Sequence, residues 1–389
     1  MVRRTSSMVI RSVMIFLIVV VTGCLDPYYP PIETSDVDIL VVDGALDTSS
    51  GEASVVLSRG VALSEPDSFP RVSNALVTIE DKQGNVYPLA GSGNGNYQAT
   101  GIPVNEKMRY RLHVITSGND EYYSDDVAPR YTPPIDSITW ITDDNQLAIR
   151  VNAHDATGQS RYYRWSFDET WNYHSAVLSL YKVVGKSIVP KKPDEIYFYC
   201  WRTQSSSSIL INSTVRLSED IVSQFPIHYI EAGSRKFQMK YSILVKQRVI
   251  SEDEYHYLEQ LKKTTESIGG LFDPQPGQVT GNIRRVNTDA PLAVGYFGAG
   301  NTVSSRIFIN TETLPVAFRE IWPQLGCTPP DTVCVVPNAF RCVINATDLT
   351  EGYTIGISLE DDAGFTLTNI PCSDCRNEGG VPTKPDYWP

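Results

Sequence analysis

Short segments that alternate apolar and polar residues, each bounded by turn residues, recur along most of the chain. In "EKMRYRLHVIT", every second residue from Met108 to Val114 is apolar, and Arg109, Arg111 and His113 lie between them. This period of two places apolar side chains on one face of a β-strand and polar side chains, His113 included, on the solvent face. The 389 residues include 21 tyrosines, 26 glycines and 25 prolines, a composition that favours strands and turns. We therefore expect a mainly β protein.

The first strand-rich part covers residues 37–130 and indicates a small β-sandwich. In "SNALVTIEDKQGNVYPL", Ala75, Val77 and Ile79 lie on one face of a strand, and a turn at 81–84 leads into a return strand. The pattern "ALVTIEDKQGNVY", "GNGNYQAT" and "YRLHV" resembles the prealbumin-like and carboxypeptidase-regulatory-like sandwiches of many exported bacterial proteins. The resemblance implies the same small sandwich here.

A proline-rich linker, "DDVAPRYTPPIDSITW", predicts the boundary to a second, larger domain over residues 135–389. Alternating apolar residues in the segments 147–151 and 163–167 predict a hairpin similar to those of fibronectin-type domains. One helix is predicted within this domain, over residues 251–268. Ser251 and Glu254 form a capping-box pattern at its start, and two glycines follow its end. We expect a fibronectin-like β domain with one inserted helix and a cysteine-rich end.

The N-terminus has the pattern of a signal peptide. Basic residues precede an uninterrupted apolar run of nine residues, Val13 to Val21, whereas a membrane-spanning helix needs about 20. The order Val-Thr-Gly-Cys at residues 21–24 resembles the bacterial lipobox, in which the cysteine is lipidated and becomes the first residue of the mature protein. We expect a signal peptide over residues 1–23, lipid on Cys24 and an extended tether over residues 24–36. The alternative is a secreted protein whose cysteine follows its signal by chance.

Six further cysteines agree with an exported protein, because an even number in an oxidising compartment indicates disulfides. The sequence leaves all 15 complete pairings open. The simplest arrangement ties the "CSDC" tail to the segment that holds Cys327 to Cys342. A redox pair is disfavoured because no βαβ pattern surrounds the motif, and the cysteine spacing fits zinc poorly. The disulfide candidates are Cys200, Cys327, Cys334, Cys342, Cys372 and Cys375.

The sequence carries few signs of catalysis or cofactor binding. It lacks the common hydrolase, zinc-protease, phosphate-loop and EF-hand motifs, and its five histidines are scattered singly. Asp168 and Glu169 are adjacent in a predicted strand and therefore face opposite sides. A weak calcium candidate is the acidic turn Glu360, Asp361 and Asp362. With a net charge of −12 the chain is a poor partner for nucleic acid, and we expect no cofactor.

The aromatic segment "YYRWSFDETWNYH" has two interpretations. Alternate rings fill a sandwich core, which is the simpler interpretation for Trp165 and Phe167. Exposed rings would instead form a stacking surface for sugars or a contact for a protein partner. Trp171 and Tyr173 are the candidates for such a binding surface.

Taken together, these motifs resemble the lipoprotein family called domain of unknown function 4249. The residues that carry the resemblance are the lipobox, "VVDG", "SNALVTIED", "YYRWSFDETW", "GGLFDPQPGQVTGNI", "VGYFGAG" and "CSDCRNEGGVPTKPDYW". The resemblance implies a lipid-anchored outer-membrane protein, often encoded beside TonB-dependent transporters, with no catalytic residues to carry over. The periplasmic or cell-surface face stays open, because the single Asp26 does not decide it.

We therefore expect a non-enzymatic binding or accessory subunit whose partners are the membrane, through its lipid, and an outer-membrane β-barrel transporter. Two alternatives remain at this point: a hydrolase that acts on glycans or peptides, and a free-standing glycan binder at the cell surface.

Overall fold

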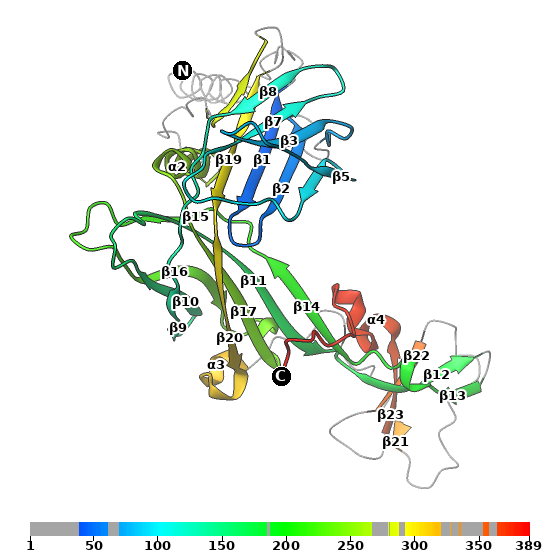
Figure 1. Cartoon of the computed structure of the whole chain (residues 1–389). Coiled ribbons are helices and arrows are strands. Elements are labelled where there is room, and N and C mark those ends of the chain that lie inside the picture. The colour runs from blue at the N-terminus through cyan, green and yellow to red at the C-terminus, as the bar shows by residue number, and fades with distance from the viewer. Residues whose placement is uncertain are drawn as a thin grey trace, which may run out of the picture.

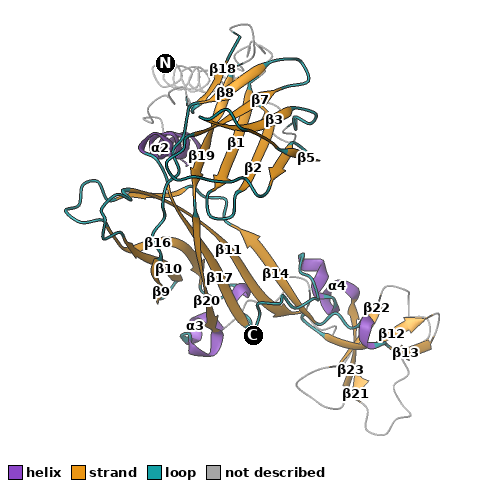
Figure 2. Cartoon of the chain, viewed as in Figure 1, coloured by secondary structure: helices purple, strands orange, loops and turns teal. Residues whose placement is uncertain are grey.

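The computed structural model describes residues 39–60, 70–184, 187–266, 279, 281–287, 292–319, 327, 334–335, 353–357 and 364–389. The predicted signal peptide, Cys24 and the tether lie outside these residues. The described chain is mainly β, with β-sandwich domains, as the sequence predicts (Figures 1 and 2). None of the helices in the described ranges combines the length and apolar character that a membrane span requires.

The first sandwich packs two sheets, with strand orders β19-β1-β2-β6-β5 and β18-β8-β7-β3-β4 (Figure 1). Alternate residues of these strands face the shared core; in β1, for example, Leu40, Val42 and Leu46 are buried. The strands are β1 (Leu40–Asp47), β2 (Glu52–Arg59), β3 (Leu76–Asp81), β4 (Val86–Pro88), β5 (Ala90–Gly93), β6 (Asn96–Ala99), β7 (Tyr110–Ile115), β8 (Glu121–Ser124), β18 (Ile283–Arg285) and β19 (Ala293–Gly300).

The expectation that residues 37–130 form this sandwich alone is wrong. β19 pairs in parallel with β1 over its whole length, from Leu40–Ala293 to Asp47–Gly300, and β18 pairs antiparallel with β8. Residues 281–300 therefore belong to the first sandwich, although the sequence places them in the second domain. A parallel pair needs a long crossover, so no local turn signal reveals it.

The second sandwich packs the sheet β16-β10-β9 against the sheet β14-β11-β17-β20, with β15 also pairing with β11. This arrangement confirms the expected fibronectin-like domain. Its strands are β9 (Ile135–Thr142), β10 (Gln146–His154), β11 (Tyr162–His174), β14 (Tyr199–Ser205), β15 (Leu210–Ser213), β16 (Ile221–Glu231), β17 (Lys240–Val249) and β20 (Thr302–Asn310). The short helices η2 (Arg235–Phe237), η3 (Thr311–Thr313) and α3 (Val316–Arg319) complete it. In contrast, η1 (Pro193–Glu195) follows β13 (Ser187–Pro190) and binds β12 (Leu178–Val184) through the ion pair between Glu195 and Lys182.

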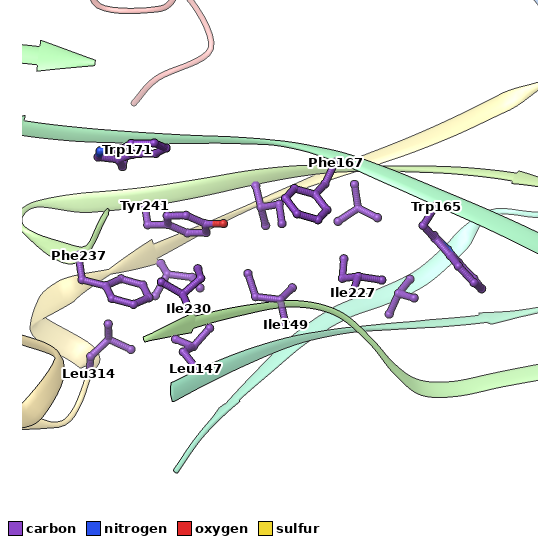
Figure 3. Close-up of a cluster of buried hydrophobic side chains, with 14 of the residues drawn as sticks. Leu147, Ile149, Trp165, Phe167, Trp171, Ile227, Ile230, Phe237, Tyr241 and Leu314 are labelled. Atoms are coloured by element: carbon purple, nitrogen blue, oxygen red, sulfur yellow. The ribbon is translucent and has the colours of Figure 1, made fainter. Parts of the chain in front are cut away.

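The core of the second sandwich lies between these two sheets (Figure 3). Trp165 and Phe167 point from β11 toward Ile149 and Ile227 of the opposite sheet. The buried Trp165 indole N–H donates to Gln247 Oε1 at 2.9 Å, so its polar atom is satisfied. The core interpretation of Trp165 and Phe167 is confirmed.

The predicted helix is α2 (Glu252–Glu266), inserted between β17 and β18. Ser251 Oγ accepts the Glu254 backbone N–H at 3.1 Å, as the capping-box pattern predicts. The Glu254 carboxylate turns to Arg248 and lies 3.8 Å from Arg164. The last two residues of the predicted helix, 267 and 268, lie outside the described residues.

A third sheet, which the sequence does not predict, projects from one end of the second sandwich (Figure 1). Its strand order is β13-β12-β22-β23-β21. The elements are β12 (Leu178–Val184), β13 (Ser187–Pro190), β21 (Cys334–Val335), β22 (Tyr353–Ile357) and β23 (Gly364–Asn369), followed by α4 (Ile370–Ser373) and η4 (Cys375–Glu378). The predicted C-terminal domain therefore contains the second sandwich and this smaller sheet, in addition to residues 281–300 that join the first sandwich.

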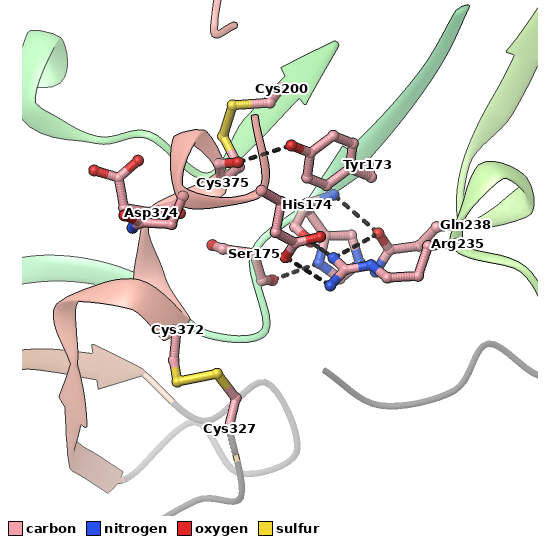
Figure 4. A network of polar contacts seen from close by, with 12 residues as sticks. Tyr173, His174, Ser175, Cys200, Arg235, Gln238, Cys327, Cys372, Asp374 and Cys375 are labelled. Atoms are coloured by element: carbon pink, nitrogen blue, oxygen red, sulfur yellow. Dashed lines mark hydrogen bonds and ion pairs between the residues drawn. A yellow bond between two sulfur atoms is a disulfide. The ribbon is translucent and has the colours of Figure 1, made fainter. Parts of the chain in front are cut away.

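Two disulfides hold the C-terminal segment (Figure 4). Cys372 pairs with Cys327, which lies in the segment from Cys327 to Cys342 to which the sequence predicts the tail to bond. Cys375 pairs instead with Cys200 of β14. The second pairing departs from the simplest expectation, because neighbouring cysteines bond to different parts of the chain. The Cys334 side chain and Cys342 lie outside the described residues.

Beyond the disulfides, the C-terminal segment packs along the sheet that contains β11. Tyr173 Oη donates to the Cys375 carbonyl oxygen at 2.8 Å (Figure 4), and Arg235 binds Glu378 at 2.6 Å. The Tyr387 hydroxyl lies 2.9 Å from Thr170 Oγ1, and Trp388 is buried. The segment therefore passes around the edge strand β14, because it contacts Tyr173 on the core face of β11 and Thr170 on the outer face.

Replacing both Cys200 and Cys375 by alanine should lower the free energy of unfolding by about 2–5 kcal/mol, since the bond closes a loop with a sequence separation of 175 residues. The matched pair Cys327→Ala with Cys372→Ala opens a loop of separation 45, so its loss should be about 1 kcal/mol smaller. Denaturant unfolding of the two double variants checks the order. An unchanged denaturation midpoint in the variant without Cys200 and Cys375 would contradict the conclusion that this disulfide stabilises the fold.

Candidate functional site

A cavity of about 550 Å³, here called the α2 cavity, lies between α2 and the first sandwich. Ser251, Asp253, Tyr257 and Gln260 line it from α2 and the turn before this helix. The opposite walls come from the residue before β7, the segment after β8, β18 with the segment that enters it, and β19. On these walls the lining residues include Arg109, Asp125, Asp126, Arg130, Asn282, Arg284 and Tyr296.

The buried side chain of Asn282 forms part of one wall of the α2 cavity. Its amide makes the pair of hydrogen bonds to β19 that the backbone of a neighbouring strand would make. Its Nδ2 donates to the Phe297 carbonyl oxygen and its Oδ1 accepts the Phe297 N–H, each at 2.9 Å. Its backbone N–H donates to the Gly295 carbonyl at 3.1 Å. The edge of β19 that faces away from β1 is thereby hydrogen-bonded, which fixes the segment before β18 beside β19.

Two glycines make this close approach of backbones possible. A Cβ at position 281 would lie 1.5 Å from the Gly295 carbonyl oxygen, and one at position 295 would lie 1.9 Å from the Val42 carbonyl oxygen. Gly295 also has a φ of 143°, which side-chain-bearing residues rarely adopt. The segments "GNI" and "VGYFGAG", quoted above for the family resemblance, thus meet at the α2 cavity for a steric reason.

The charged groups around the α2 cavity largely pair with one another. Arg284 binds Asp125 at 3.2 Å, and Lys82 binds Asp126 at 2.5 Å. Arg109 donates to the backbone carbonyl of Asp126 at 3.3 Å, and the Glu254 carboxylate binds Arg248. The cavity therefore presents both signs of charge side by side, with no large excess of either.

Two tyrosines give the α2 cavity aromatic walls. The rings of Tyr257 and Tyr296 lie 5.7 Å apart between centroids. The Tyr296 hydroxyl lies 2.9 Å from Ser251 Oγ, and burial raises the pKa of Tyr296 to about 12. Burial also raises the pKa of Tyr257. Both phenols are therefore neutral at physiological pH and act as uncharged hydrogen-bonding groups.

A second cavity, of about 430 Å³, lies between the two sandwiches. Burial tends to raise the pKa of Asp155 there, but hydrogen bonds from Thr157 and Ser160 outweigh it and hold the pKa at about 2. These bonds close the turn between β10 and β11, so the carboxylate has a structural role. In the ranges that the structure describes, no cluster of three or more His, Cys, Asp or Glu side chains is placed to hold a metal ion.

The prediction that Trp171 and Tyr173 form an exposed binding surface is wrong. Their side chains are 6% and 1% exposed and belong to the core of the second sandwich. β11 continues unbroken through His174, so Trp171 and Tyr173 lie on the same face as Trp165 and Phe167. The other predicted sites, Cys24 and the turn Glu360, Asp361 and Asp362, lie outside the described residues.

Asp168 and Glu169 face opposite sides of β11, as predicted. Asp168 binds Lys246 at 2.7 Å, and Glu169 is buried on the core side. Around Glu169, the Lys236 amine lies at 2.6 Å, the Tyr241 hydroxyl at 3.0 Å and the His228 ring at 3.1 Å. Glu169 thereby connects β11 to β16, β17 and η2. These three partners compensate the burial of its charge, so Glu169 links the two sheets of the sandwich.

Stability should fall in acid through Glu169. Burial tends to raise its pKa, but the hydrogen bonds from His228 and Lys236 outweigh burial and lower it from its usual value of 4.5. The ionised carboxylate thus stabilises the fold above pH 4.5, and this contribution is lost as the pH falls through the folded pKa. Melting temperatures are measured from pH 7 to pH 2.5. Below pH 4.5 the melting temperature of Glu169→Gln should fall less steeply with pH than that of the wild type. Glu312→Gln, on the surface, is the control, and equal slopes in Glu169→Gln and wild type would refute the claim.

Gly281→Ala should destabilise the protein by at least about 2–3 kcal/mol, because the new methyl group overlaps the Gly295 carbonyl oxygen. Gly118→Ala is the control, since a Cβ there meets its nearest atom at 3.5 Å. The control should change stability by less than about 1 kcal/mol. Chemical denaturation of both variants measures the difference, and equal stabilities would show that the two segments do not meet as described.

The comparisons with known proteins concern the family and the fold. A sequence model described as "Domain of unknown function (DUF4249)" matches residues 25–306, which include all residues that line the α2 cavity. A solved segment of two fibronectin type-III domains from chicken tenascin is similar at 11% identity, covering 54% of this chain and 89% of that chain with a TM-score of 0.15. No curated protein matches the sequence. The family match spans well over half of the chain and confirms the predicted kinship: the protein belongs to the family described as domain of unknown function 4249.

Proposed function

We propose that the protein is a non-enzymatic, lipid-anchored lipoprotein of the outer membrane that acts as a binding or accessory subunit of a TonB-dependent transporter. The observation that carries the proposal is the family match, which begins at residue 25, directly after the cysteine that the lipobox predicts as the lipidated residue. Acyl chains on Cys24 would anchor the protein without a membrane-spanning helix.

The arrangement of the domains supports a binding role. The two sandwiches and the third sheet follow one another in an extended array (Figure 2), which offers a partner a long surface. The Cys200–Cys375 disulfide fixes η4 against β14 of the second sandwich, and the Cys327–Cys372 disulfide holds α4 to a segment after α3. Such stapling suits a protein that works outside the cytoplasm.

A free-standing glycan binder is the second candidate, because the α2 cavity is lined mainly by polar side chains and two tyrosines. The hydrolase alternative has less support. Asp168 and Glu169, the carboxylates considered for it, are both held in ion pairs that connect strands or sheets.

Co-purification tests the proposal directly. Affinity isolation of the tagged protein from outer membranes, solubilised in mild detergent, should recover a large β-barrel protein identifiable by mass spectrometry. The variant Cys24→Ser should leave the membrane fraction and lose that partner, because it lacks the acylated sulfur. Recovery of the wild-type protein alone would contradict the proposed partnership, and membrane retention of Cys24→Ser would contradict the proposed anchor.

A further inference from the structure

We infer that the α2 cavity binds a short, neutral glycan. This inference rests on the proposed function, since it names the ligand class that a binding subunit would capture. The cavity volume of about 550 Å³ lies within the range of about 300–1,000 Å³ that is usual for small-molecule sites.

The charge arrangement argues for a ligand without net charge. An anion in the cavity would lie close to Asp125, Asp126 and Asp253, and a cation would lie close to Arg109, Arg130 and Arg284. Neither ligand gains a clear electrostatic advantage from walls of mixed sign. An amino acid or dipeptide would also lose the hydration of two full charges, and it would have to compete with ion pairs such as Arg284–Asp125.

The hydrogen-bonding groups of the cavity suit a ligand rich in hydroxyl groups. Each hydroxyl group donates one hydrogen bond and accepts others, so it can bridge a carboxylate and a guanidinium without breaking their pairing. Asp253 supplies acceptors, Arg130 supplies donors, and the Gln260 amide supplies both. An apolar ligand would leave these groups without partners, which costs free energy.

The two tyrosines supply the remaining feature of a sugar site. A pyranose ring is polar at its rim and apolar on its C–H faces, and an aromatic ring can cover such a face while its hydroxyl stays hydrogen-bonded. Tyr257 and Tyr296 line the cavity, and Ser251 holds the Tyr296 hydroxyl. Tyr296 is thereby fixed in orientation, so its ordering costs less on binding.

Titration calorimetry on the full chain in detergent tests the inference. The probes are neutral di- to tetrasaccharides of glucose, galactose, mannose and N-acetylglucosamine, with dialanine, citrate and spermidine as zwitterionic, anionic and cationic probes. At least one neutral oligosaccharide should bind saturably and the other probes should not. Saturable binding of a charged or zwitterionic probe in place of a sugar, or no saturable binding by any probe, would overturn the inference.

Variants connect that binding to the α2 cavity. Asp253→Ala and Gln260→Ala, both at exposed positions of α2 and so compatible with folding, should each weaken sugar affinity at least about tenfold. Lys263→Ala is the matched control on the same helix, outside the cavity lining, and should bind like the wild type. Unchanged sugar affinity in both Asp253→Ala and Gln260→Ala would overturn the conclusion that the sugar binds in the α2 cavity. Co-purification of the β-barrel with these variants separates the two proposals, because a wrong ligand class leaves that partnership intact.

Discussion

The parallel pairing of β1 with β19 is the interaction on which the rest of the molecule depends. It brings a segment from late in the chain into the first sandwich and, through β20, leads straight back to the second. The chain crosses between the sandwiches three times, after β8, after β17 and after β19, and Thr132, Val249 and Gly300 bring these crossings side by side. Arg130 pairs with Gly300, and Thr132 donates two hydrogen bonds to Asn301, from its backbone N–H to Oδ1 at 2.7 Å and from its hydroxyl to the carbonyl oxygen at 2.6 Å. The connection between the sandwiches is thus a hydrogen-bonded set of three crossings, stiffer than a single linker of the kind that the prolines suggest.

The α2 cavity is a consequence of the same pairing. β19 must approach β1 and the segment before β18 so closely that only glycine fits at positions 281 and 295. Asn282 then occupies the far edge of β19, and α2, inserted between β17 and β18, covers the adjacent space. The residues that form the walls come from distant parts of the sequence, and the backbones of Asn282 and Arg130 bond directly to β19. A cavity built in this way is largely preformed, which lowers the entropic cost of binding a ligand.

Local patterns predicted the elements well and their partners poorly. Period-two alternation identified strands in both sandwiches, among them β3, β7, β10 and β11, and the opposite orientations of Asp168 and Glu169, and the pattern at Ser251 identified the start of α2. The same alternation, continued along β11, would have placed Trp171 and Tyr173 in the core. The β1–β19 pair, the Cys200–Cys375 bond and the third sheet depend on contacts between distant segments, which periodicity does not encode. The α2 cavity has no local signal either, apart from the glycines and Asn282 of the family segments.

The most direct test of this account is native-state hydrogen exchange, followed by mass spectrometry, on peptides that cover residues 40–47 and 293–300. If β1 and β19 form one ladder, amides that bond across it should exchange with closely similar free energies of opening, and their protection should be lost together as denaturant is raised. Residues 293–300 that exchange rapidly while residues 40–47 stay protected would contradict the pairing, and with it the shape of the α2 cavity.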